Sequence, residues 1–382
     1  MIRGPLRVVL FCAAVPLAAQ QAPKRTVEFS GLALVNGFFN NAPVNNSDVP
    51  YFVLPDTAPA GAGGGSIRQT RFGVLVTDPG VLGGNFTGEV DADFFGGQEP
   101  SVGGRTFPLV RLRRAVGTLA WAHSQLLFGQ EVPLVAERNP RSLAAVGIPD
   151  FAGAGNLWFW LPQLRVTAEA GYTLRLALQL AALAPTEGRP QSDSLITRPD
   201  SAERSRRPYL EGRVRLGWGP ADDPSELAIG GHLGWLARGD TLLKSQAATI
   251  DARIKLGPLE LIAEAFTGQA LAGLGGGGIN QNLGPLSATV RTKGGWAQLN
   301  LKPVRQLTLG GGCGLDDPND DDLRPATGPA QGRLKNFVCA GHIDIRPSGP
   351  LVFGVEYRRL KTTYSTGEFT DNHINVAAGF QF

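Results

Sequence analysis

Apolar and polar residues alternate along many short segments of the chain. In residues 85–94 apolar positions alternate with polar ones, and the polar ones are Thr87, Glu89, Asp91 and Asp93. The same division recurs in residues 208–218 and 247–256, where the polar set again contains charged side chains. Because successive side chains of a β-strand point to opposite faces, each segment is predicted to be a strand with one apolar and one charged face.

Sixteen such strands are predicted, each close to the length needed to cross a membrane when tilted. Their ranges are 26–38, 67–78, 85–95, 107–115, 118–129, 157–168, 172–183, 208–218, 226–237, 244–256, 259–270, 292–301, 305–314, 335–346, 351–363 and 371–382. The last strand is expected to pair with the first at a seam. Its polar residues His373, Asn375 and Gln381 would then face the lumen, and Phe382 the lipid.

The connections between these strands are expected to alternate strictly between short and long. Short ones include 169–171, 257–258, 302–304 and 347–350, and long ones include 39–66, 130–156, 184–207, 271–291 and 315–334. Short turns at one end and long loops at the other are typical of outer-membrane barrels. The predicted fold class is therefore all-β, a transmembrane antiparallel up-and-down β-barrel of about sixteen strands. The alternative, a soluble β-sandwich, would bury the faces that carry charge here.

The first twenty residues have the pattern of a secretory signal peptide. Arg3 and Arg7 flank the start of the apolar stretch 8–17, and Ala18-Ala19-Gln20 follows. Residues 1–20 are expected to be removed, so that residues 21–382 form a single barrel domain. The net charge of +3 would fall to about +1 (3 − 2) with the loss of these two arginines, which gives no support for nucleic-acid binding.

The three cysteines form no metal-binding motif. Cys12 lies in the expected leader, whereas Cys313 and Cys339 lie on neighbouring predicted strands and face the same side. An oxidising compartment would permit a disulfide between them. Two unlinked small residues facing lipid remain the alternative.

The alternating C-terminal segment Ile374, Val376, Ala378, Phe380, Phe382 resembles the ending of Gram-negative porins, in which a terminal phenylalanine is read by the barrel-assembly machinery. Within the porins, short motifs resemble the DcaP-like trimeric group; they are Phe29-Ser30-Gly31, Arg71-Phe72-Gly73, Gly129-Gln130 and Asp316-Asp317-Pro318-Asn319. The resemblance implies a sixteen-stranded trimer whose third external loop folds into the lumen. In this chain that loop is 130–156, which carries Glu131, Glu137, Arg138, Arg141 and Asp150.

Charged residues on the predicted inward faces are candidates for contact with a solute. The cations are Arg71, Arg111, Arg113, Arg165, Arg213 and Arg215, followed by Arg253 and Lys255. The carboxylates are Glu89, Asp91, Asp93, Glu211 and Asp251. Two interpretations stay open: a basic ladder that conducts anions, and a wall in which the arginines pair with the acids. Arg114 is outward by parity and is expected at the periplasmic rim of the lipid face.

Two further groups have chemistry of their own. The acidic loop 316–322 has carboxylates that would suit Ca²⁺, but it lacks the downstream glutamate of an EF-hand and is more simply a solvated loop. The pairs His342 with Asp344 and His373 with Asn375 each share a strand face, but no serine motif completes a hydrolase site. We therefore expect lumen-facing histidines with hydrogen-bond partners, and no enzyme.

Together these features predict a passive diffusion channel for small hydrophilic solutes, with a preference for anions such as dicarboxylates that derives partly from the resemblance. A non-selective pore and a closed structural or adhesive barrel are the alternatives. The expected partners are outer-membrane lipid, small anionic solutes, further copies of the chain in a homotrimer, and the assembly machinery. No cofactor is expected.

Overall fold

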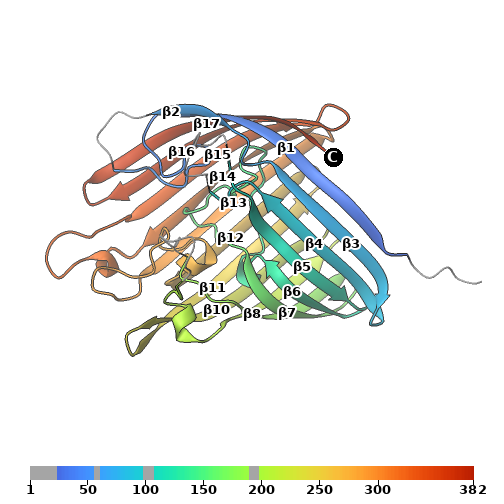
Figure 1. Cartoon of the computed structure of the whole chain (residues 1–382), viewed down its shortest axis with the longest axis horizontal. Coiled ribbons are helices and arrows are strands. Elements are labelled where there is room, and N and C mark those ends of the chain that lie inside the picture. The colour runs from blue at the N-terminus through green and yellow to red at the C-terminus, as the bar shows by residue number, and fades with distance from the viewer. Residues whose placement is uncertain (1–23, 56–60, 98–106, 189–197) are drawn as a thin grey trace, which may run out of the picture.

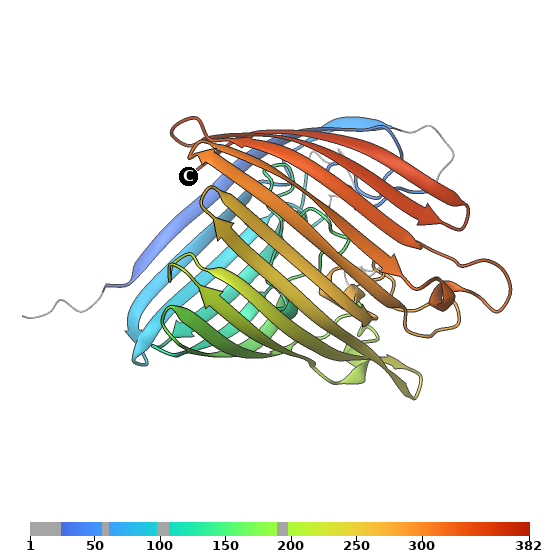
Figure 2. The ribbon, with the colours of Figure 1, turned by 180° about the vertical axis from the view of Figure 1, so that it is seen from behind.

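The chain forms a closed antiparallel β-barrel. The computed structural model describes residues 24–55, 61–97, 107–188 and 198–382, so the expected leader lies outside the described residues. β1 pairs with both β2 and β3, and from β3 onward each strand is hydrogen-bonded to the next along the chain. The two views show the strands tilted around a common axis (Figures 1 and 2). Among the described residues, no helix is long and apolar enough to span a membrane.

The strands cover most of the described chain, and only short 3-10 helices interrupt the loops. The strands are β1 (Thr26–Asn40), β2 (Ala62–Ser66), β3 (Arg71–Val81), β4 (Gly84–Asp93), β5 (Arg111–Ala120), β6 (Ser124–Glu131), β7 (Leu161–Ala170), β8 (Leu174–Leu183), β9 (Tyr209–Trp218), β10 (Ser225–Arg238), β11 (Thr241–Leu256), β12 (Leu259–Gln269), β13 (Arg291–Val304), β14 (Leu307–Pro318), β15 (Lys335–Ile345), β16 (Leu351–Tyr364) and β17 (Gly367–Gln381). The 3-10 helices are η2 (Leu134–Ala136), η3 (Glu203–Ser205), η4 (Ala272–Leu274) and η5 (Asp320–Leu323).

These seventeen strands fill sixteen positions around the barrel, because β2 and β3 share one position. β3 pairs with the first half of β1 and β2 with its second half, so residues 67–70 interrupt a single crossing. Thr70 Oγ1 accepts from Leu34 N at 3.0 Å and donates to Leu34 O at 3.1 Å, which satisfies the backbone of β1 at the interruption. The predicted strand count is confirmed, but the expected loop 39–66 contains β2.

Alternate residues of most strands face lipid and lumen as predicted. In β8 the leucines at 174, 176, 178 and 180 are exposed on the outer wall, whereas Ala177, Gln179 and Ala181 are buried. An outward apolar band suits lipid, and closure leaves no unpaired sheet edge within it.

Two predicted boundaries, the end of strand 107–115 and the start of strand 118–129, are wrong. The expected break at 116–117 lies inside β5, and the turn comes at 121–123. Gly117 is paired with Phe128 of β6, and a Cβ on Gly117 would lie 2.5 Å from the phenylalanine ring. This glycine therefore makes room for an aromatic ring within the sheet.

The alternation of short and long connections is not strict. At the long-loop end of the barrel, Gly239-Asp240 joins β10 to β11 and Ser365-Thr366 joins β16 to β17 as tight hairpins. The strands of both hairpins extend past the predicted ranges and consume residues expected in loops. At the rim of the barrel, the position where a strand ends depends on its pairing with the adjacent strand. The alternation pattern alone does not show this pairing.

The seam between β1 and β17 is confirmed. Leu32 to Asn40 pair with Gln381 to His373, and the backbones of Gly31 and Phe382 exchange two further hydrogen bonds of 2.9 and 3.1 Å. The Phe382 ring lies against Gly31, where a Cβ would come within 2.2 Å of it. His373 and Asn375 are buried on the inner side of the seam.

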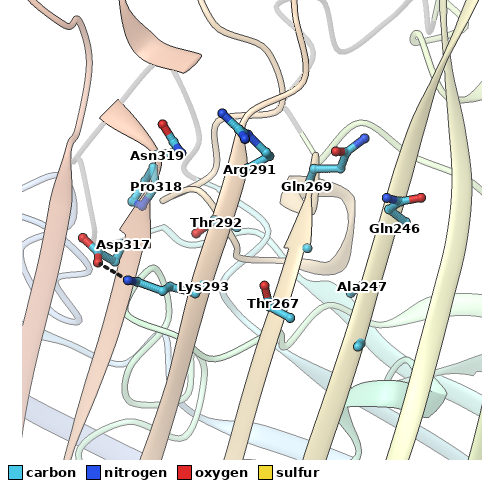
Figure 3. Close-up of a pocket in the computed structure, with 12 residues that line it drawn as sticks. Gln246, Ala247, Thr267, Gln269, Arg291, Thr292, Lys293, Asp317, Pro318 and Asn319 are labelled. Atoms are coloured by element: carbon cyan, nitrogen blue, oxygen red, sulfur yellow. Dashed lines mark ion pairs between the residues drawn. The ribbon is translucent and has the colours of Figure 1, made fainter. Parts of the chain in front are cut away.

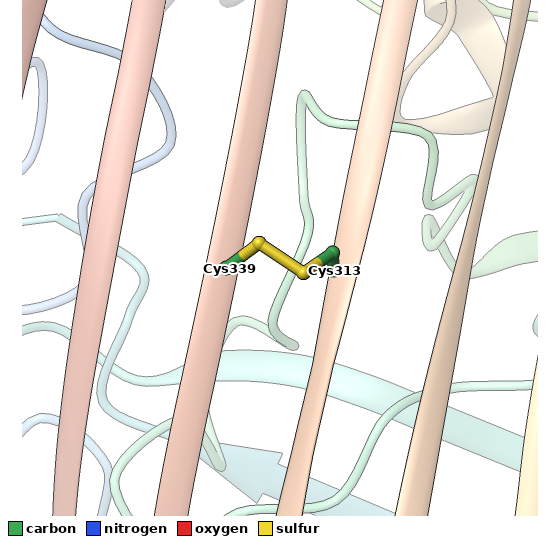
Figure 4. Close-up of a disulfide and its surroundings, with 2 residues drawn as sticks. All are labelled: Cys313 and Cys339. Atoms are coloured by element: carbon green, nitrogen blue, oxygen red, sulfur yellow. A yellow bond between two sulfur atoms is a disulfide. The ribbon is translucent and has the colours of Figure 1, made fainter.

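Cys313 of β14 and Cys339 of β15 are directly paired across the two strands, and their sulfur atoms are bonded (Figure 4). Both lie on the face that carries the exposed residues Leu309 and Phe337. The outer connection 319–334 lies between the two cysteines in the chain, so the bond closes it into a loop. The sequence separation of the cysteines is 26.

The disulfide gives a testable prediction for stability. Closing a loop of this length in the unfolded chain is worth about 3 kcal/mol, so C313A/C339A should lower the free energy of unfolding by that order. Urea titration of the barrel in detergent micelles measures the change. The protein without substitutions, once denatured, should also react with a maleimide only after reduction. Labelling of both cysteines without reductant would contradict the pairing.

Candidate functional site

The connection between β6 and β7, residues 132–160, contacts inward-facing side chains of strands on several sides of the barrel. Leu134 N donates to Glu211 of β9 at 2.6 Å. Arg138 forms ion pairs with Glu226 of β10 and, at 3.1 Å, with Asp251 of β11. Arg141 reaches Glu260 of β12 at 2.8 Å. The first half of this connection is thereby fixed to the wall formed by β9–β12.

The second half of the same connection is fixed to a different part of the wall. The Gln69 side chain donates to Ala144 O at 2.6 Å and accepts from Val146 N at 2.6 Å and Gly147 N at 3.1 Å. The buried Arg358 of β16 pairs with Asp150. The segment is therefore in contact with inward-facing side chains on two separate parts of the wall.

A buried charge cluster joins this segment to β7 and β9. Glu137 lies between Arg165, at 2.5 Å, and Arg213, at 2.7 Å, and Arg213 also binds Asp251 at 2.7 Å. Burial on its own would raise the pKa of Glu137, but the two guanidinium groups outweigh it and hold that pKa below its usual value. All of these charges have partners, so little of their field reaches the open lumen.

A second cluster combines arginines with aromatic rings. Arg111 binds Asp93 at 2.6 Å and lies 5.4 Å from the centroid of Phe95 and 5.2 Å from that of Trp160. Arg113 lies 4.8 Å from the Trp160 centroid and donates to Val146 O at 3.0 Å. These contacts fix both side chains against the wall.

Between the segment 132–160 and the wall lies a cavity of about 760 Å³. Its lining comes from β1, β3, β4, β5, β6, β15, the chain end and the segment itself. The charged residues around it are Arg71, Glu89, Asp91, Arg113, Arg114, Glu131, Glu137, Arg141, Asp344 and Arg346.

The residues predicted from sequence divide into two groups. Arg71, Arg113, Glu131, Glu137 and Arg141 line this cavity. Arg111, Arg138, Arg165, Arg213 and Arg215 lie outside its lining and take part in ion pairs within the wall. Arg253 and Lys255 pair with Asp223 in the turn between β9 and β10. Sequence reasoning missed Arg346 and Trp160 as lining residues of this cavity. It placed Asp344 on the strand face of His342 but did not propose it as a contact for a solute.

The expected outward orientation of Arg114 is wrong. Pairing between β4 and β5 shifts by one residue, so that Asp91 faces Arg114 and Ala92 faces Leu112. Such a bulge reverses the parity of the strand beyond it. Arg114 therefore points inward, where it binds Glu89 at 2.6 Å and Glu131 at 2.8 Å.

The histidines have structural surroundings. His232 Nδ1 lies 2.9 Å from Glu211 Oε1 and its Nε2 lies 3.1 Å from Ser245 Oγ, which is the connectivity of a hydrolase triad. All three residues are buried, and Ser245 Oγ donates to Ala270 O at 2.8 Å, so the hydroxyl faces no cleft. His342 differs from the expectation, because its two ring nitrogens have no hydrogen-bond partner in the part of the chain that the structure describes.

The acidic loop does not bring its carboxylates together. Asp316 accepts from Thr292 Oγ1 at 2.6 Å and from Ile279 N at 2.9 Å, whereas Asp322 binds Arg291 at 2.8 Å. Across residues 24–55, 61–97, 107–188 and 198–382, no group of three or more His, Cys, Asp or Glu is placed to hold a metal ion.

The position of Glu137 predicts a dependence on pH. Since the folded-state pKa of Glu137 is lowered, its contribution to anchoring is present above its usual value of 4.5 and is lost as pH falls through the folded value. Single-channel conductance should therefore change below about pH 4.5, and E137Q should show that change already at pH 6. E169Q removes a carboxylate paired with Arg215 away from the segment and is the control. Identical pH profiles for native protein and E137Q would contradict the assignment.

Comparison with known proteins defines the fold. No protein-family model matches the chain, and no curated protein matches it in sequence. Among solved structures, the outer-membrane channel DcaP of Acinetobacter baumannii superposes with a TM-score of 0.70 at 17% identity, over 94% of this chain and 97% of that one. An anion-selective porin from Comamonas acidovorans gives 0.57 at 12% identity, over 94% and 100%.

A third solved structure is a trimer form of OmpT, an outer-membrane protein of Vibrio cholerae, with a TM-score of 0.51 at 9% identity, over 94% of this chain and 99% of that one. Each likeness spans nearly the whole of both chains, so it concerns the barrel as a whole rather than one hairpin motif. The chain therefore has the complete sixteen-stranded fold of the outer-membrane porins, with DcaP among its structural neighbours.

Proposed function

We propose that the protein is a passive diffusion channel of the bacterial outer membrane that prefers small anions such as dicarboxylates. The observation that carries this proposal is the unequal exposure of opposite charges in the lumen cavity. Cations and carboxylates are equally numerous among its charged lining residues. A solute, however, meets only the groups at the surface.

The exposed charges of the cavity are mainly guanidinium groups. The side chains of Arg71 and Arg141 are 41% and 47% exposed. The carboxylate side chains behind them are far less exposed, at 5% for Asp91, 11% for Glu131 and 16% for Glu137. Two carboxylates are more exposed: Glu89, at 30%, is neutralised by Arg114 at 2.6 Å, and the half-buried Asp344 accepts a hydrogen bond from Leu143 N at 3.4 Å. Guanidinium donors match carboxylate and phosphate oxygens, and charge lining a narrow passage sets its selectivity.

The segment 132–160 narrows the passage in this proposal. Its contacts with β9–β12 and with β16 support a position across the path between the two barrel ends, and Arg141 lines the cavity. Arg71 projects from β3 on the facing wall. Small anions would pass between these two arginines. At each arginine, a solute oxygen would replace a water molecule as the acceptor of a guanidinium N–H group.

The assembly that we propose is a homotrimer, formed after the leader 1–20 is removed from the single barrel domain 21–382. The likeness to the trimer form of OmpT supports the oligomer, and the likeness to the Comamonas porin supports the anion preference. Insertion would use the barrel-assembly machinery, which reads the terminal Phe382, and the outward apolar band would contact outer-membrane lipid.

The competing functions are a non-selective pore and a closed structural or adhesive barrel. The proposal contains no enzymatic step, because the Ser245 hydroxyl faces no cleft. A channel in a planar bilayer separates the competing functions, since a closed barrel carries no current and a non-selective pore gives no reversal potential in a KCl gradient.

Replacing both exposed arginines provides the direct test. R71Q/R141Q should reduce the ratio of chloride to potassium permeability at least threefold and bring the reversal potential toward zero, because Arg71 and Arg141 are more exposed than Arg113 and Arg114, at 10% and 29%. The control R359Q/K361Q removes two cations from the outward face of β16 and should leave the ratio unchanged. Unchanged selectivity in R71Q/R141Q, or cation preference in the native channel, would overturn the anion proposal.

A further inference from the structure

A groove of about 690 Å³ lies on the outer wall of the barrel, near the long-loop ends of β11–β14. Figure 3 shows its polar side chains, which come from four neighbouring strands and include Gln246, Gln269, Arg291, Lys293 and Asp317. The groove takes no part in the lumen, and the channel function leaves it unused.

Strand register places the groove on the lipid-facing side. Thr267 pairs with Lys293 and Lys293 with Asp317, so these three side chains form one row across β12, β13 and β14. The same face carries the exposed Ile250 and Leu299 two or more residues nearer the middle of the barrel. Since long loops are extracellular in such barrels, this end meets the outer leaflet.

The charge of the groove is positive at its surface. Lys293 is 73% exposed and lies 3.5 Å from Asp317, whose side chain is 27% exposed. Arg291 is 58% exposed and holds the 14% exposed Asp322 through two hydrogen bonds of 2.8 and 2.9 Å. Lys335 on β15 adds a third cation 3.9 Å from Asp317. Three cations thus lie beside two carboxylates that are largely covered. The exposed Asp321 of η5 is paired with a further cation, Arg324, at 3.4 Å.

A lane of small residues continues from the groove toward the middle of the barrel. Ala265 of β12 pairs with Gly295 of β13, and Ala297 follows on the same face. Larger apolar side chains border the lane, with Ile250 on β11 and Leu315 on β14. A strip with little side-chain volume between two apolar ridges fits an extended acyl chain.

We propose that this groove binds an anionic, phosphate-bearing lipid of the outer leaflet, with the phosphate at Lys293 and Arg291 and one acyl chain along Ala265, Gly295 and Ala297. Cationic side chains at the interface attract lipid phosphate, and the adjoining apolar lane adds burial of methylene groups. A second protein copy is a weaker fit, because three exposed lysine and arginine side chains would have to lose water against it.

Native mass spectrometry of the delipidated barrel in detergent tests the headgroup. Dimyristoyl phosphatidylglycerol should bind at least fivefold more tightly than dimyristoyl phosphatidylcholine, and R291Q/K293Q should abolish the difference. The matched control K302Q/R305Q removes the same charge from the opposite end of the same hairpin, where both residues are exposed. This control should keep the difference in affinity between the two lipids. Equal binding of both lipids to the native barrel, or equal loss in both variants, would overturn the site.

Two further arms test the lane and the source of the phosphate. A265F should fill the lane and weaken binding of the dimyristoyl lipid at least threefold, while A378F on β17 should not. Inorganic phosphate at 10 mM should leave the lipid bound, because it lacks the chain. Full displacement by inorganic phosphate, or an unchanged affinity in A265F, would overturn the lipid assignment. A change of oligomeric state in R291Q/K293Q alone would instead identify the groove as a contact between copies and overturn it as well.

Discussion

Every backbone N–H and C=O group within the lipid-facing band must have a hydrogen-bond partner, and the seam between β1 and β17 completes that requirement. Unpaired peptide groups in hydrocarbon cost several kcal/mol each, so an open sheet would not persist there. The pairing of Leu32 to Asn40 with His373 to Gln381 removes the last two edges. The interruption between β2 and β3 is tolerated because Thr70 supplies the missing partners for Leu34.

Closure also creates the second constraint, which is the cost of charge in an enclosed lumen. Arg213 and Arg358 are almost fully buried, and each binds two carboxylates. Removing one partner of such a group would leave a buried charge uncompensated, which costs several kcal/mol. The segment 132–160 provides Glu137 and Asp150 as two of these carboxylates, so the same ion pairs that neutralise the wall also fix the segment in place.

The inner and outer surfaces use the same residue types for different purposes. Arginines of the inner wall are mostly consumed by carboxylates, and only Arg71 and Arg141 keep large exposed fractions among the predicted lumen cations that line the cavity. On the outer wall, Arg291 and Lys293 remain exposed beside a strip of small residues. These two exposed pairs, Arg71 with Arg141 inside and Arg291 with Lys293 outside, are therefore distinguished from the other cations by their exposure and not by the number of charges around them.

The sequence by itself determined the barrel, its sixteen crossings and the orientation of most side chains. This was possible because alternation with a period of two is a local property, and its repetition along residues 26–382 leaves few folds. The direction of Arg114, the role of Gly117 and the division of the arginines depended on tertiary structure. A bulge shifts parity only relative to a neighbouring strand, and a glycine opposite Phe128 is recognised only once the strands are paired. Arg213 is neutralised by carboxylates that are distant in sequence, Glu137 and Asp251.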